Sequence, residues 1–238
     1  MCYFKTCFLI IFFFVFFQFS VFSQTVNIQG SGNVQVKNGK VKASNNVVVG
    51  DGQYTTKSFN LSKVNSIEHE ISGNLEIYYS DNCSVEISAD NNILGLFNVS
   101  APGGKLNIKS TKSYVSNFQV SIRIYTNTLS SIALESSGNI NAYDINSKKL
   151  KIVLNGSGNI YCSGKVTDLN ILLEGSGNIS CKDLIADKAE ITHQGSGNIN
   201  VYSHSYLKIN HHGSGDIYFW GNPKTYIDND GMGDIYSN

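Results

Sequence analysis

Gly156-Ser157-Gly158-Asn159-Ile160 is the stretch that decides the fold, because close copies of it recur along the second half of the chain. With the second glycine of each copy as the reference, the copies lie at Gly138, Gly158, Gly177, Gly197, Gly215 and Gly233, which are 18 to 20 residues apart. A fixed period of this length is typical of solenoids, in which each repeat stacks on its neighbours. The period therefore predicts a stack of short coils.

Alignment of the copies shows which positions face inward. Isoleucine occupies the position six residues before the reference glycine and the position two residues after it in all six copies. The other even positions are mostly apolar and the odd positions are mainly polar, which is the alternation of a strand with one buried face. We therefore predict an all-β fold, a parallel β-helix or solenoid, with a small flattened or triangular cross-section and a right-handed path.

The glycines of the copies lie on the inward side, where the chain must turn a corner. Glycine reaches positive φ without a steric penalty and the following Asn or Asp tolerates the same region, so we expect a left-handed corner at each copy. The residues after the reference glycine should stack as a ladder of Asn139, Asn159, Asn178 and Asn198. Asp216 and Asp234 take the last two places, where they cannot exchange amide hydrogen bonds and mark the exposed terminal coils.

Composition narrows the class of function. The chain has 238 residues, zero formal net charge and a single arginine, Arg123. Without a basic cluster, binding to nucleic acid is not expected. No helix is predicted beyond the first twenty residues.

The first residues form a targeting segment. Lys5 precedes an apolar run from Cys7 to Phe17, and Val21-Phe22-Ser23 fits a cleavage site that would leave Gln24 as the mature N-terminus. An uncleaved anchor is the alternative, but the run is short for a membrane span and has one flanking positive charge. We therefore predict export, with no membrane span after cleavage.

The chain divides into four predicted parts. Residues 1–23 are the signal peptide, and residues 24–53 are an N-terminal cap or linker with one motif copy, Gly30-Ser31-Gly32-Asn33. Residues 54–129 form an irregular β half, with larger coils or a sandwich-like cap. Residues 130–238 form the regular solenoid repeats.

Several motifs together resemble one family. They are Gly73-Asn74-Leu75-Glu76-Ile77, the segment from Val85 to Leu94, Gly104-x-Leu106-x-Ile108 and the Gly-Ser-Gly-Asn-Ile copies. In combination they resemble the putative auto-transporter adhesin, head GIN domain family, over roughly residues 26 to 238. Its members are exported bacterial proteins, common in Bacteroidota, whose domain has no known function. The resemblance implies a β-solenoid and an adhesin-like role, and it supplies no catalytic residue.

Exposed aromatic side chains are the candidate binding residues. The candidate set for glycan binding is Tyr143, Tyr161, Tyr202, Tyr218 and Trp220. Aromatic faces on a flat β surface can stack on sugar rings while Asn and Ser supply hydrogen bonds. The alternative is that the tyrosines, with Tyr236, shield strand edges and stack on one another.

Two groups could bind a metal ion. Asp228, Asp230 and Asp234 alternate with glycine near the C-terminus as in a calcium loop, although a soluble end cap explains the same residues. His193 and His211 replace leucine in an inward column, and with Asp216 or Asp230 they could bind zinc. A core that becomes polar toward its open end, with histidines bonded to turns or water, is the favoured interpretation.

Three cysteines follow the targeting segment. Cys162 and Cys181 occupy the same inward position in successive coils, at a spacing that a disulfide could bridge. Two free thiols are favoured, because other coils fill this position with small apolar residues. Cys83 has no predicted partner.

Together these features predict an exported, non-enzymatic cell-envelope protein with no cofactor, an adhesin-like module for binding or surface presentation. The expected partner is a surface glycan or another envelope protein. Two alternatives stay open: a periplasmic structural scaffold, and a β-helix enzyme that acts on polysaccharide, although such sites gather arginine and lysine in a groove. The expected location is the periplasm, the outer-membrane surface or the extracellular space.

Overall fold

The computed structural model describes residues 47–69 and 73–238 and, between residues 20 and 43, only the backbone of short strands. Those strands are β1 (Ser20–Val21), β2 (Gln24–Thr25), β3 (Asn27–Gln29), β4 (Val34–Lys37) and β5 (Lys40–Ala43). The predicted signal peptide lies outside the described residues except for two residues in β1, and so does the motif copy from Gly30 to Asn33.

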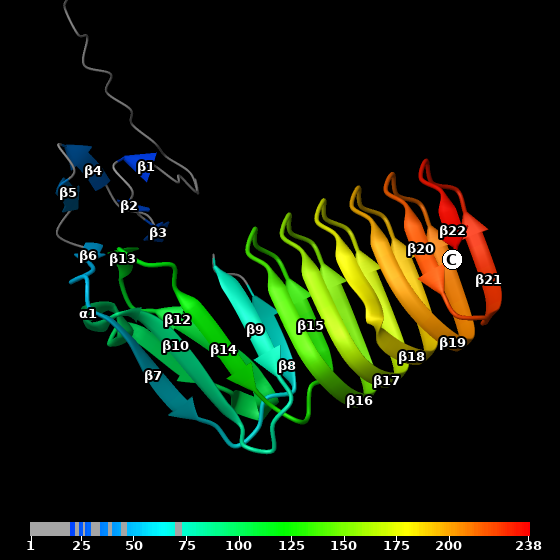
Figure 1. The fold of residues 1–238 in the computed structure, drawn as a ribbon, viewed down its shortest axis with the longest axis horizontal. Coiled ribbons are helices and arrows are strands. Elements are labelled where there is room, and N and C mark those ends of the chain that lie inside the picture. The colour runs from blue at the N-terminus through cyan, green and yellow to red at the C-terminus, as the bar shows by residue number, and fades with distance from the viewer. Residues whose placement is uncertain are drawn as a thin grey trace, which may run out of the picture.

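Four long strands build the regular half, and each contributes to two opposite walls. They are β16 (Ile140–Leu154), β17 (Ile160–Leu173), β18 (Ile179–His193) and β19 (Ile199–His211). Each pairs with the next in parallel along its length, with a register shift where the chain bends from the first wall to the second. The stack ends in β20 (Ile217–Trp220), β21 (Lys224–Asn229) and β22 (Ile235–Ser237), the last coils in Figure 1. The predicted solenoid is confirmed, while its right-handed path stays a prediction.

The irregular half continues both walls. In the first wall, β9 (Asn74–Tyr78) pairs in parallel with the start of β16 and with β14 (Ser121–Tyr125). In the second wall, β15 (Ser131–Leu134) pairs in parallel with the end of β16 and with β8 (Ser66–His69). These parallel pairs make the core continuous through both halves.

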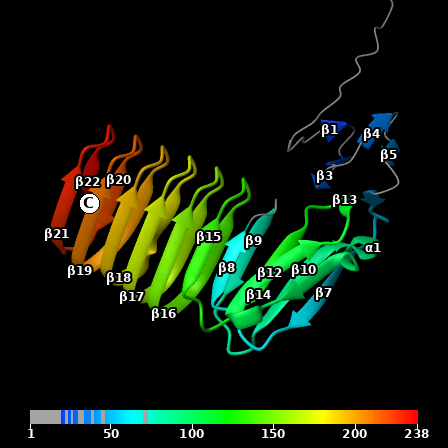
Figure 2. The ribbon, with the colours of Figure 1, turned by 180° about the vertical axis from the view of Figure 1, so that it is seen from behind.

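Antiparallel pairing appears at the far end. The first wall ends in β10 (Ser84–Asp90) and β7 (Tyr54–Asn60), which both pair antiparallel. In the second wall β12 (Lys105–Ser110) joins β8 in parallel, and β11 (Phe97–Ser100) pairs with β12 antiparallel. A small sheet of β3, β13 (Ser113–Ser116) and β6 (Val47–Val49) lies beside them. Figure 2 shows the same order from behind.

Two short helices lie in the irregular half. They are α1 (Asn91–Leu94) and the 3-10 helix η1 (Pro102–Gly104). The prediction that no helix follows the first twenty residues is therefore wrong. A single turn of α1 buries Ile93 and Leu94 against the end of the stack, and one turn is too short to produce a helical period in the sequence.

The two isoleucine columns form the core, as predicted. Before the last coil every member of both columns is at most 1% exposed. Burial of one such side chain contributes about 2 kcal/mol. The first-wall column continues into the irregular half, since Ile140 is in register with Leu75, which is in register with Ile122.

The expected left-handed corner at the glycines is wrong. None of the six reference glycines from Gly138 to Gly233 has a positive φ, and Asp144 is the only non-glycine residue with one among the described residues. Asp144, Gly164 and Gly221 place the left-handed conformation at the opposite bend instead. The reference positions need glycine because stacked turns approach closely: a Cβ on Gly158 would fall on the carbonyl oxygen of Gly138.

The predicted ladder is confirmed. The side-chain oxygen of Asn139 accepts the backbone N–H of Asn159 at 2.9 Å and its side-chain amide at 3.2 Å, and the next coil repeats both bonds. Asp216 keeps the main bond, since its carboxylate accepts the backbone N–H of Asp234 at 2.9 Å. Aspartate in the last coils therefore loses only the bond between side chains.

The cysteines are free thiols, as favoured by the sequence. Cys162 and Cys181 are fully buried in the same inward column, and Cys83 is half-buried. The hydrogen bond between the two thiols and their burial raise the pKa of Cys181. The two thiols therefore act as small apolar side chains of the core.

Candidate functional site

Four tyrosines form a row on the outer face of the first wall. Ring centroids lie 5.6 Å apart between Tyr125 and Tyr78, 5.3 Å between Tyr78 and Tyr143, and 5.9 Å between Tyr143 and Tyr161. All four side chains are half-buried. We call them the tyrosine row; it crosses four adjacent strands, β14, β9, β16 and β17.

Strand register explains why the rings meet. Tyr125, Tyr78 and Tyr143 are partners in successive parallel strands, and each follows an inward-facing residue, so all three point outward. Tyr161 is in register with Asn141 and therefore lies diagonally from Tyr143. Stacked strands about 4.8 Å apart bring such rings into contact.

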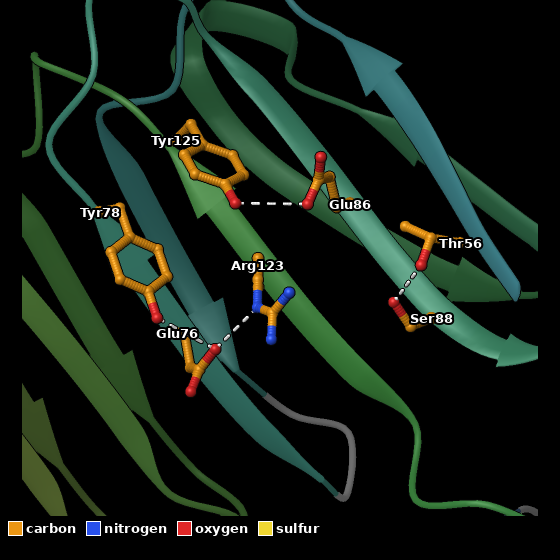
Figure 3. A network of polar contacts seen from close by, with 7 residues as sticks. All are labelled: Thr56, Glu76, Tyr78, Glu86, Ser88, Arg123 and Tyr125. Carbon is orange, nitrogen blue, oxygen red and sulfur yellow. Dashed lines mark hydrogen bonds and ion pairs between the residues drawn. The ribbon is translucent and has the colours of Figure 1, made fainter.

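Carboxylates hold the phenol hydroxyls at one end of the row (Figure 3). Glu76 accepts hydrogen bonds from the Tyr78 hydroxyl at 3.2 Å and from Arg123 Nε at 3.0 Å. Glu86 accepts from the Tyr125 hydroxyl at 3.2 Å. Burial and then Glu76 raise the pKa of Tyr78, so this hydroxyl stays protonated at neutral pH. An exposed ion pair stabilises a fold by only about 0 to 1 kcal/mol, so the network mainly orients polar groups.

A shallow pocket opens beside Tyr143. Its empty space of about 220 Å³ includes open solvent, and its lining includes Tyr79, Asn127 and Asn146. Sites that enclose a small molecule usually measure about 300 to 1,000 Å³. Because most of this space is open solvent, the enclosed part has room for little more than a water molecule, and the pocket is a shallow contact surface that does not enclose a ligand.

The five predicted aromatic residues all lie on the first wall, but in two groups. Tyr143 and Tyr161 belong to the tyrosine row. Tyr202, Tyr218 and Trp220 lie on β19 and β20, where Tyr202 is in register with Trp220. Tyr218 stacks on Tyr236 with ring centroids 5.0 Å apart. The sequence analysis gave stacking of tyrosines on one another as the alternative to glycan binding, and such stacking is present in both groups.

Sequence reasoning missed part of the first group. Tyr78 lies five residues after Gly73, as Tyr143 lies five residues after Gly138, so the repeat could have identified it. Tyr125 follows no motif copy. Glu76, Glu86 and Arg123 come from separate segments that only the strand pairing brings together.

The predicted metal-binding residues do not gather. In the part of the chain that the structure describes, no group of three or more His, Cys, Asp or Glu side chains could hold a metal ion. Asp228 and Asp230 are exposed at the last strand of the second wall. Asp234 belongs to the ladder, where its carboxylate accepts the Tyr236 hydroxyl at 3.2 Å.

His193 and His211 lie inside the last coils as a stacked pair. Both are fully buried, their ring centroids are 4.6 Å apart, and none of their ring nitrogens has a hydrogen-bond partner. His69, in the same column, instead bonds the Gly73 carbonyl at 2.9 Å. Burial first, and then the neighbouring His211, lower the pKa of His193 to about 4. The favoured interpretation, histidines bonded to turns or water, fits His69. For the stacked pair it stays a prediction.

No helix among the described residues combines the length and apolar character that crossing a membrane requires. No curated protein matches the chain.

Solved structures with the same fold include three bacterial proteins. A "putative adhesin" of Bacteroides fragilis NCTC 9343 aligns with a TM-score of 0.66 at 20% identity, over 80% of this chain and 100% of that one. A "putative adhesin" of Parabacteroides distasonis ATCC 8503 gives 0.53 at 18% identity, over 81% and 100%. A "putative lipid binding protein" of the same strain gives 0.50 at 21% identity, over 80% and 96%. At these identities the likeness shows the fold alone.

A family model described as "Putative auto-transporter adhesin, head GIN domain" matches residues 64–223. The match contains the tyrosine row and the regular coils from β16 to β20, and it ends before β21. Because it covers more than half of the sequence, the chain belongs to the putative auto-transporter adhesin, head GIN domain family.

Proposed function

We propose that the chain is an exported, non-enzymatic binding module that attaches to a surface glycan through the tyrosine row. The observation that carries the proposal is the continuous row of half-exposed rings from Tyr125 to Tyr161 beside Glu76 and Glu86. Sugar rings offer apolar C–H faces to aromatic side chains and hydroxyl groups to carboxylates and amides. The row and its neighbours present both kinds of contact on one surface.

The flatness of the site favours a polymer over a small molecule. The tyrosine row crosses four strands, and the pocket beside Tyr143 is too small to enclose a typical small-molecule ligand. An extended glycan lying across the strands can place its units against the rings, with one unit over the shallow pocket. Asn127 and Asn146, which line the pocket, are hydrogen-bonding partners for its hydroxyl groups.

The late group of Tyr202, Tyr218 and Trp220 is a second contact on the same wall. Two strands separate Tyr218 from Tyr161, since Tyr161 is followed in register by Ser180, Asn200 and then Tyr218. Strand spacing places Tyr161 and Tyr218 about 14 Å apart. A polymer that reaches both groups would bind more tightly than either contact allows alone, through a high effective concentration.

Membership in an adhesin-named family supports this role, as does the predicted signal peptide. The family description and two of the structures with the same fold carry the word adhesin. We place the protein at the cell envelope or outside the cell.

A structural scaffold is the second candidate, because the tyrosines also stack on one another. In the row the rings contact their neighbours, and the Tyr218 and Tyr236 rings are nearly parallel at 16°. Such contacts stabilise a sheet surface without any ligand. The scaffold therefore predicts a folded protein that binds no glycan.

A glycan array separates the two candidates. The exported chain should bind at least one class of glycan, and the Tyr143→Ala/Tyr161→Ala variant should lose that binding. The matched control is Tyr206→Ala/Tyr226→Ala. It removes two tyrosines of the second wall whose ring centroids are 5.5 Å apart, and it should bind glycan as the native chain does. Equal losses in both variants, or no binding by the native chain with or without calcium, would reject the glycan site.

A further inference from the structure

The last coil of the solenoid is uncovered. Ile227 is 48% exposed, whereas the isoleucines at the same position of the earlier coils are at most 1% exposed. Ile235, the last member of the other column, is half-buried. Among the described residues β21 pairs only with β19, and β22 only with β20. This end therefore presents apolar side chains and unpaired backbone groups, which is a template for another strand.

One motif copy precedes the stacked repeats in the sequence. Relative to Gly32, the segment 26–36 has the full pattern of a coil: Val26, Ile28, Gly30, Gly32, Asn33, Val34 and Val36 match the inward, glycine and ladder positions. Its two described pieces lie in separate sheets, since β3 pairs antiparallel with β13 and β4 pairs antiparallel with β5. Both pieces lie at the opposite end of the molecule from β21 and β22 (Figures 1 and 2).

We propose that the segment 26–36 of one copy adds as a further coil onto β21 and β22 of a second copy. In the register of the repeats, Val26 would cover Ile227 and Val34 would cover Ile235. Because β3 and β4, the described pieces of the donor segment, lie at the opposite end from the acceptor edge, a second copy supplies the coil rather than the same chain. The interface is heterologous and does not close, so it generates a head-to-tail filament.

Chemistry at the ladder position favours this pairing. The carboxylate of Asp216 accepts the backbone N–H of Asp234 at 2.9 Å, and Asp234 can accept the backbone N–H of Asn33 in the same way. The Asn33 side-chain amide can also donate to that carboxylate, as Asn159 donates to Asn139 at 3.2 Å. The Asp234 carboxylate of the last coil would therefore meet the neutral amide of Asn33 and not a second carboxylate.

The glycines of the segment meet the steric requirement. A Cβ on Gly233 would fall on the carbonyl oxygen of Gly215, and every reference position from Gly138 onward shows the same close approach. Gly32 brings glycine to this position in the added coil. We assign the segment 26–36 of a second copy to this edge on three grounds: the exposed apolar edge, the coil-like sequence of the segment and the glycine at position 32. This inference is independent of the proposed glycan site, although a filament would align many such sites.

Cysteine cross-linking tests the register directly. One Cys83→Ser protein carries Gln35→Cys and the other carries Tyr236→Cys, because both positions lie three residues after the reference glycine. Mild oxidation of the mixture should link the two proteins. The matched control replaces Tyr236→Cys by Tyr161→Cys, which lies in the same column in the middle of the stack. Equal linking at Tyr161→Cys, or none at Tyr236→Cys, would overturn the proposal.

Sedimentation velocity over a range of concentrations tests the assembly. The exported chain should form a growing series of oligomers. Gly32→Val should abolish them, whereas Ser31→Met should keep them, since Met232 occupies that position in the last coil and is 85% exposed. A native chain that stays monomeric, or oligomers that survive Gly32→Val, would contradict the added coil.

The acceptor edge has its own matched pair of variants. Ile227→Lys should abolish the oligomers, and Ile185→Lys should leave them unchanged. The two isoleucines are 48% and 47% exposed, but Ile185 lies on the side of the stack. Thermal unfolding of both variants checks that each is folded. Equal behaviour of the two variants would show that the last coil is not the interface.

Discussion

The regular coils from β16 to β22 and the irregular half from β7 to β14 share one core but are held together differently. In the regular coils the backbone of each turn rests on the backbone of the turn below, so that a Cβ on Gly177 would fall on the carbonyl oxygen of Gly158. In the irregular half, side chains make the equivalent links. The buried carboxylate of Asp90 accepts bonds from Ser116 at 2.6 Å and from the Gly52 N–H at 2.7 Å.

This difference indicates which substitutions each half tolerates. A repeated backbone contact depends on the absence of a side chain, so any residue other than glycine disrupts it. A side-chain network depends on one particular group, and most of its surroundings can vary. The two halves should therefore respond oppositely to the same kind of substitution.

The largest expected effect is that of a methyl group on a stacked glycine. Gly177→Ala should lower the free energy of unfolding by about 4 kcal/mol or more, because backbone and not a flexible side chain must move. Gly95→Ala is the control from the irregular half, where a Cβ meets nothing within 4 Å and should change stability by less than about 1 kcal/mol. Urea unfolding followed by circular dichroism measures both, and equal losses would contradict the comparison.

Removal of the buried carboxylate should have the next largest effect. Burial alone would raise the pKa of Asp90, but hydrogen bonds from Asn117, Ser116 and the Gly52 N–H outweigh it and hold the pKa below its usual value. Asp90→Ala leaves these donors unpaired and should cost about 3 kcal/mol. Asp168→Ala, on the outer face of a regular coil, should cost less than about 0.5 kcal/mol. A similar loss in both variants would show that the network does not hold the irregular half.

The stacked histidines make the last coils sensitive to acid. The pKa of His193 is about 4 in the folded protein and 6.5 ordinarily, so the unfolded chain binds the proton first as pH falls. The free energy of unfolding is therefore unaffected by protonation of His193 above pH 6.5, and it falls by about 3 kcal/mol as the pH drops from 6.5 to 4. His193→Leu, which restores the leucine of earlier coils, should unfold with a flatter dependence on pH. Parallel pH profiles of Tm for the two proteins would contradict this assignment.

The smallest expected effect concerns the ladder. Asn159→Asp keeps an acceptor for the Asn178 backbone N–H, now 3.0 Å away, and should cost about 0.5 kcal/mol. Asn159→Ala removes that acceptor and should cost about 1 kcal/mol. Differential scanning calorimetry of the two variants ranks them, and a larger loss for Asn159→Asp would show that the bond between side chains matters more.

The fold of the regular half was predictable because the repeat period can be measured directly from the positions of the motif copies. Isoleucine at two fixed positions identified both walls, and the ladder followed from Asn139 and its equivalents. The role of the glycines was not predictable in the same way: one coil read alone suggests a corner, whereas the close contact exists only between coils. The helix α1 was not predicted because its single turn is too short to show the hydrophobic period of a helix.

The candidate site was only half predictable, for the same reason. Tyr143 and Tyr161 could be assigned to the outer face by alternation within one coil. Arg123 and Glu76 are 47 residues apart, and neither position follows from a local pattern. Their contact depends on β14 pairing with β9, which the spacing of the irregular half does not encode.

Attachment of whole cells tests the central claim, a glycan-binding first wall, most directly. Non-adherent bacteria would display the native chain, the Tyr143→Ala/Tyr161→Ala variant or the Tyr206→Ala/Tyr226→Ala variant at equal surface density, over a layer of the glycan found on the array. The account predicts that the native chain and the second-wall variant attach equally and that the first-wall variant does not attach. Equal attachment by all three would contradict a binding site on the tyrosine row.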